Sequence, residues 1–134
     1  MGFVLDASAA ATWFFEDEFD EASATLATRL ATEGAVAPAI WPLEMLNIFT
    51  SAVRRQRIDS KTAAAFGKKA MRFEVDFEQT EGKPAEKALG IALRHSLSFY
   101  DATYVELAHR RRIPLATQDG RLKEVARSLK IRVL

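Results

Sequence analysis

The stretch FVLDASAA, residues 3–10, sets how the chain begins to fold. Its first three residues, Phe3–Leu5, are an apolar run that predicts a short buried strand. Asp6 interrupts this run, and Ala7–Phe15 is predicted to form a helix that packs on the strand. In parallel α/β sheets the carboxyl ends of the strands lie along one edge, where ligand-binding groups gather. Asp6 is therefore placed where a functional acid is expected.

The rest of the chain alternates between strand and helix patterns. Further strands are predicted at Ala35–Ala37, Phe73–Phe77, Pro114–Thr117 and Ile131–Leu134. Helices are predicted at 20–31, from 42 to about 52, and at 59–71, 84–97, 99–111 and 121–129. The segment 73–78 alternates apolar and acidic residues, as a half-exposed strand at a sheet edge does. The fold class predicted is α/β, a three-layer α/β/α sandwich around a short, mainly parallel sheet of four to five strands.

Length and composition fit one domain that spans residues 1–134. Of the 134 residues, 49% are hydrophobic and 28% charged, which is ordinary for a domain with a real core. There is no cysteine, so disulfides, thiolate metal sites and a cysteine nucleophile are excluded. This fits a reducing cytoplasm, where we expect the protein to act. We expect no signal peptide and no membrane span.

The net charge of +1 conceals an uneven distribution. Residues 1–50 hold eight acids and one base, and the remainder holds ten acids and eighteen bases. Such a basic half can attract a polyanion, although basic residues at helix ends also favour the helix dipole. The basic clusters are Arg54, Arg55 and Arg57; Lys68, Lys69 and Arg72; and Arg110, Arg111 and Arg112.

Four acids lie where a predicted strand or turn gives way to a helix. We refer to them as the acidic set: Asp6, Glu44, Asp101 and Asp119. Each has a structural explanation as a helix-capping or first-turn residue. Capping does not explain why all four can reach the same sheet edge. Carboxylates that converge there repel one another unless a cation lies between them.

The acidic set predicts a hard cation, because all-oxygen ligands select Mg²⁺ or Mn²⁺ over zinc. His95 and His109 lie near predicted helix ends and share no ligand spacing. Metal-activated water that attacks a phosphodiester is the chemistry that remains.

Four motifs in order resemble those of PIN-domain nucleases over essentially the whole chain. They are VLDASA at residues 4–9, PLEMLN at 42–47, SFYDA at 98–102 and TQD at 117–119. Within this family, the chain resembles the small bacterial VapC toxin branch. The resemblance implies an Mg²⁺- or Mn²⁺-dependent endoribonuclease, an RNA substrate, a cognate VapB-type antitoxin that blocks the site, and a homodimer.

The resemblance also implies a role for individual residues. Asp6 and Asp101 would be the principal metal ligands, and Asp119 would complete the cluster. Glu44 would bind metal or orient water. The supporting hydrogen bonds would come from Ser8, Asn47 and Thr117.

Other functions were weighed against this one. An aspartyl-phosphate enzyme or a receiver domain needs further acids and a lysine that this chain does not place correctly, and no Gly-rich phosphate loop is present. A non-catalytic PIN-like binding or dimerisation module needs no metal and remains open. So does a PIN nuclease of RNA processing rather than a toxin.

Overall fold

The computed structural model describes residues 2–134 and shows four strands and seven helices in that range. In chain order the first half comprises β1 (Phe3–Leu5), α1 (Ala7–Ala11), α2 (Glu21–Glu33), β2 (Ala35–Pro38), α3 (Trp41–Arg54) and α4 (Ser60–Ala70). The second half comprises β3 (Val75–Glu78), α5 (Gly82–His95), α6 (Phe99–Arg111), β4 (Leu115–Ala116) and α7 (Gly120–Ser128). Within the described range, no helix is both long and apolar enough to cross a bilayer.

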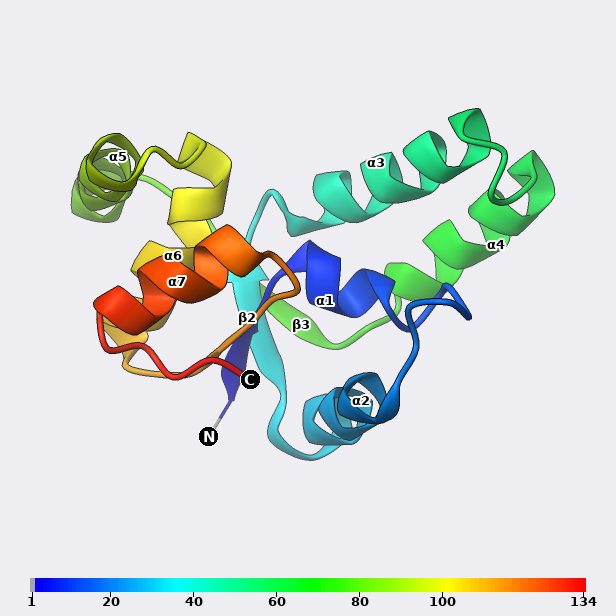
Figure 1. The fold of residues 1–134 in the computed structure, drawn as a ribbon, viewed down its shortest axis with the longest axis horizontal. Helices are drawn as coiled ribbons and strands as arrows, with labels where there is room; N and C mark the ends of the chain where they lie inside the picture. The colour runs from blue at the N-terminus through cyan, green and yellow to red at the C-terminus, as the bar shows by residue number, and fades with distance from the viewer. Residues whose placement is uncertain (1) are drawn as a thin grey trace.

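All four strands run parallel in the order β3-β2-β1-β4. Val4 of β1 lies between Val36 of β2 and Leu115 of β4. Figure 1 shows α6 and α7 on one side of the sheet and α1 and α2 on the other, so the predicted α/β fold is confirmed. The predicted edge position of the segment 73–78 is also confirmed, because β3 is an outer strand.

The prediction of a full strand at Ile131–Leu134 is wrong. The segment is reduced to one parallel bridge between Val133 and Leu115. The physical reason is that β4 has only two residues, so the segment beside it finds few backbone partners. The backbone amide of Leu115 donates to the carbonyl of Arg132 at 2.9 Å, and the amide of Leu134 donates to the carbonyl of Leu115 at 3.0 Å.

The predicted helix Ala7–Phe15 ends early, at Ala11. The hydroxyl of Thr12 donates to the carbonyl of Ala9 at 2.6 Å, and the chain continues in tight turns. These turns bury Phe14 and Phe15. Phe14 packs edge-on against Phe49 of α3, which ties the first helix to the helical arm formed by α3 and α4.

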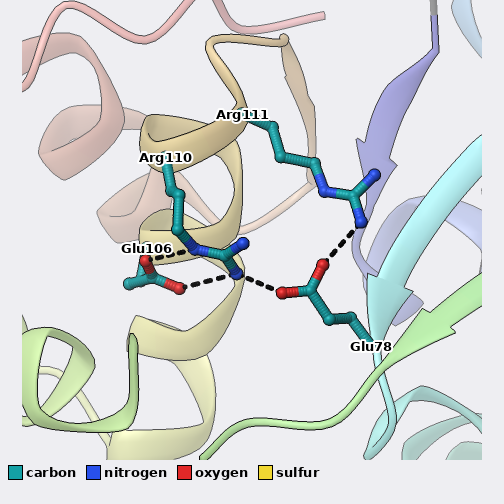
Figure 2. Close-up of polar contacts among 4 residues, drawn as sticks. All are labelled: Glu78, Glu106, Arg110 and Arg111. Carbon is teal, nitrogen blue, oxygen red and sulfur yellow. Dashed lines mark hydrogen bonds and ion pairs between the residues drawn. The ribbon is translucent and has the colours of Figure 1, made fainter. Parts of the chain in front are cut away.

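An ion-pair network joins β3 to the carboxyl end of α6 (Figure 2). Arg110 contacts both Glu78 and the buried Glu106, and Arg111 contacts Glu78 at 2.6 Å. Together the two arginines lower the pKa of Glu78 against the opposing effect of its partial burial. These arginines are therefore engaged in holding the fold and lie at the opposite end of α6 from Asp101. Their side chains are still 33% and 46% exposed, and binding of a polyanion by them stays a prediction.

We expect the Arg110→Ala substitution to lower the free energy of unfolding by about 2 kcal/mol, because it leaves a buried carboxylate without its partner. Arg112→Ala is the matched control, since Arg112 forms no ion pair among residues 2–134, and its effect should stay within about 0.5 kcal/mol. Urea titration followed by circular dichroism measures both. Equal losses in the two variants would contradict the structural role of the network.

Candidate active site

The acidic set comes from four different elements that end at one edge of the sheet. Asp6 directly follows β1, and Asp119 follows β4 at the start of α7. Glu44 lies in the first turn of α3, and Asp101 lies in the first turn of α6. All four side chains line one pocket of about 210 Å³, together with Ser8 and Asn47. The structure thus brings all four members of the acidic set to the same pocket.

Asp6 is held by two hydroxyl groups. Ser8 and Thr117 each donate a hydrogen bond of 2.6 Å to the same carboxylate oxygen, Oδ2. Asp6 is only 6% exposed, and its side chain makes no capping hydrogen bond to α1. The capping explanation is therefore wrong for Asp6, which lines the pocket instead.

Hydrogen bonds join the loop after β4 to the start of α1. The backbone amide of Gln118 donates to Ser8 Oγ at 2.9 Å, and the amide of Asp119 donates to Thr117 Oγ1 at 3.1 Å. The expected supporting positions of Ser8 and Thr117 are thus matched by their contacts. Asn47 lies at the exposed rim of the pocket.

Glu44 has a partner that sequence reasoning missed. The hydroxyl of the buried Tyr104 donates to Glu44 Oε1 at 2.5 Å. Tyr104 follows Asp101 by three residues on α6, so the two side chains lie on the same face of the helix. The three-residue spacing from Asp101 could have indicated that Tyr104 lies near the site. The apolar residues around Tyr104 instead suggest that it belongs to the hydrophobic core.

Helix capping accounts for part of the acidic set. Asp119 Oδ1 accepts from the amides of Arg121 and Leu122 at 2.8 and 3.1 Å, so capping is confirmed there. At α6 the capping side chain is Ser98, which accepts from the amide of Asp101 at 3.1 Å. No backbone amide in residues 2–134 donates to the Asp101 carboxylate.

Burial raises the pKa of Asp6, and the nearby Asp101 adds to the rise, while the hydrogen bonds from Ser8 and Thr117 oppose it. Burial also raises the pKa of Glu44, with further increases from Asp6 and Asp101. For Asp101, burial raises the pKa first and the charge of Asp119 adds to it. The negative charge of each carboxylate therefore makes ionisation of the others less favourable, and a bound cation would offset this repulsion.

The pocket fits a hard cation by the chemistry of its donors. Carboxylate, hydroxyl and amide oxygens line it, and no lysine, arginine or histidine does so among the described residues. Within residues 2–134, no three acidic or histidine side chains lie close enough together to coordinate one metal ion. A bound ion would have to pull the carboxylates inward. Oxygen-only ligation matches Mg²⁺ and Mn²⁺ and disfavours zinc.

The fold and the pocket define a parallel α/β domain with an acidic site at the carboxyl edge of its sheet. The model of the PIN domain family matches residues 3–128, and the chain therefore belongs to the PIN domain family. A search of curated proteins found no match.

Two solved structures share the fold. The crystal structure of PAE2754 from Pyrobaculum aerophilum has 23% sequence identity and a TM-score of 0.72, over 99% of this chain and 90% of that one. The crystal structure of VapC20 from Mycobacterium tuberculosis, described as a sarcin-ricin loop cleaving toxin, has 20% identity and a TM-score of 0.63, over 92% of this chain and 94% of that one.

Proposed function

We propose that this chain is an Mg²⁺- or Mn²⁺-dependent endoribonuclease that acts in the cytoplasm as the toxin of a toxin-antitoxin pair. The observation that carries the chemistry is the single pocket lined by carboxylates from four elements and by no basic side chain in the described part of the chain. Membership of the PIN domain family supports a nuclease. The VapC20 toxin, which shares the fold, supports the toxin class, and with it an antitoxin that blocks the site.

Each residue of the pocket has a distinct role in this proposal. Asp6, Asp101 and Asp119 would hold the ion, and Glu44 would bind it or orient the attacking water. When bound, the ion would supply positive charge to the phosphodiester oxygens and lower the pKa of water.

The remaining groups position these ligands. Ser8 and Thr117 fix the carboxylate of Asp6 through one oxygen, Oδ2. Tyr104 fixes Glu44 in the same way. Asn47, exposed at the rim, presents an amide that can donate to a phosphate oxygen.

The test is cleavage of RNA by the purified chain in Mn²⁺, with Asp6→Asn as the inactive control. We expect discrete cleavage products from the parent and at least a hundredfold slower cleavage by the variant, about 2.7 kcal/mol in the barrier. RNA that stays intact with the parent would favour a non-catalytic module. Equal cleavage by both proteins would identify a contaminating ribonuclease.

We propose that the chain forms a homodimer through α5. This helix packs on α6 through Ala88 and Ala92, which are buried. The neighbouring face, about 100° round the helix, presents Leu89 and Leu93, which are 50% and 75% exposed. Such a pair of exposed leucines on one helix is suited to a second copy of the same surface.

Leu93→Glu should therefore convert the dimer to a monomer, with a dissociation constant raised at least tenfold, about 1.4 kcal/mol. Met71→Glu is the control, because Met71 is also exposed and lies at the C-cap of another helix, α4. Analytical ultracentrifugation over a range of concentrations measures the association. A Leu93→Glu protein that dimerises as well as the control would exclude this surface.

A further inference from the structure

A second and larger pocket lies directly behind the candidate active site. It has a volume of about 580 Å³ and is lined by residues of α1, α2, β4 and the segment that follows β4. Its walls are largely apolar, from Ala9, Ala22 and Leu26 among others. The volume is in the range of small-molecule sites. We refer to it as the α2 pocket.

The α2 pocket shares a hydrogen-bonded wall with the active site. Thr117 and Gln118 line the α2 pocket, whereas Ser8 lines the active site. Ser8 Oγ lies 3.2 Å from Thr117 Oγ1 and accepts from the amide of Gln118 at 2.9 Å. Thr117 also donates to Asp6. One layer of residues therefore separates the two pockets, which places the α2 pocket next to the candidate active site.

Helix α2 presents polar groups of opposite charge to this pocket. Glu21, Thr25 and Arg29 all line it and follow one another at four-residue intervals, so they lie on one face of the helix. Arg29 uses Nε to contact Glu33 at 2.7 Å, which leaves its terminal nitrogens free of that bond. Within residues 2–134, the Glu21 side chain forms no ion pair.

We propose that the α2 pocket binds a guanine base of the RNA strand, beside the cleaved bond. This proposal rests on the proposed ribonuclease function. Guanine offers N–H donors on its Watson–Crick edge to a carboxylate such as Glu21, and its O6 and N7 accept from a guanidinium such as Arg29. Among the standard bases, only guanine has two adjacent N–H donors, N1–H and N2–H, together with the acceptor pair O6 and N7. The small apolar side chains contact the faces of the flat base.

Nucleotide binding tests the pocket without any need for cleavage. In NMR titrations of the whole chain, we expect GMP to bind at least tenfold more tightly than AMP, CMP or UMP, an advantage of about 1.4 kcal/mol. Ala22→Trp should fill the pocket and abolish GMP binding. Ala24→Trp is the matched control on the outward face of the same helix and should bind GMP like the parent. Equal binding of all four nucleotides would show recognition of phosphate alone and overturn the proposal.

The cleavage map tests the same pocket in the working enzyme. With an RNA of randomised sequence, the parent should cut next to guanine, and Glu21→Gln should lose that preference because the carboxylate acceptor is gone. Retained guanine preference in Glu21→Gln would overturn the assignment. If the parent binds GMP selectively but cleaves no RNA, the ribonuclease proposal fails while the guanine pocket stands.

Discussion

Removal of divalent cations should abolish RNA cleavage by this chain, and Mn²⁺ or Mg²⁺ should restore it. The expected loss is at least a thousandfold, about 4 kcal/mol in the barrier, because no lysine, arginine or histidine among residues 2–134 lines the pocket to replace the missing positive charge. The assay is cleavage of a labelled RNA in EDTA, followed by addition of one metal at a time. Zinc should not restore turnover, since the donors are oxygens.

The same ion should also stabilise the folded protein, which can be measured without substrate. A ligand at a hundredfold excess over its dissociation constant stabilises by about 2.7 kcal/mol. The pKa of Asp6, of Glu44 and of Asp101 is raised in the folded state. Such groups favour the fold while protonated, so the metal-free protein loses stability as the pH rises through those raised values.

The shift in Tm caused by Mn²⁺ should accordingly be larger at about pH 7.5 than at about pH 4.5, where protons compete for the carboxylates. Cleavage that continues unchanged in EDTA, and is absent from the Asp6→Asn protein, would show metal-independent chemistry. A Tm shift that is independent of pH would place the bound ion away from these carboxylates.

The sequence was sufficient to predict the sheet edge that carries the site. Phe3–Leu5 is fully buried and is followed at once by Asp6, so the strand and its acid are both local features of the sequence. The same holds for Asp119 after β4. The alternation in residues 73–78 also indicated a strand, although burial does not alternate in β3, where Phe77 is 47% exposed. Parallel topology then brings the strand ends together, because the carboxyl ends of parallel strands share one edge.

What the sequence did not show depends on contacts between distant residues. Tyr104 and Glu44 are 60 positions apart, and the residues that flank each of them in the sequence do not indicate their hydrogen bond. The pairing of Arg110 with Glu78 spans 32 positions and turns an apparent surface cation into part of the fold. Local charge patterns therefore do not show which basic side chains already have a carboxylate partner in the fold.

Both misses arise where α6 meets other elements, since this helix runs from the acidic site at Asp101 to the ion pairs at Arg110. Seven consecutive residues of α6, 102–108, are buried, and so its polar side chains there must find partners inside the fold. A helix buried on every side gives no amphipathic pattern from which those partners can be inferred.

Asp101→Asn should reduce turnover at saturating RNA by at least a hundredfold, about 2.7 kcal/mol, and leave the metal-free fold at least as stable as the parent. The substitution keeps the size of the side chain and removes its charge. Because burial and the charge of Asp119 raise the pKa of Asp101, its ionised form costs stability in the absence of metal. The variant should also gain less in Tm from added Mn²⁺.

Ser98→Ala is the control that separates catalysis from helix capping. Ser98 holds the amide of Asp101, so its loss should cost about 1 kcal/mol in the free energy of unfolding. The Asp101 carboxylate remains in that variant, and its turnover should stay far above that of Asp101→Asn. If Asp101→Asn instead destabilises the metal-free protein as Ser98→Ala does and cleaves RNA normally, then Asp101 serves the helix alone. The metal would in that case have to be held by Asp6, Glu44 and Asp119.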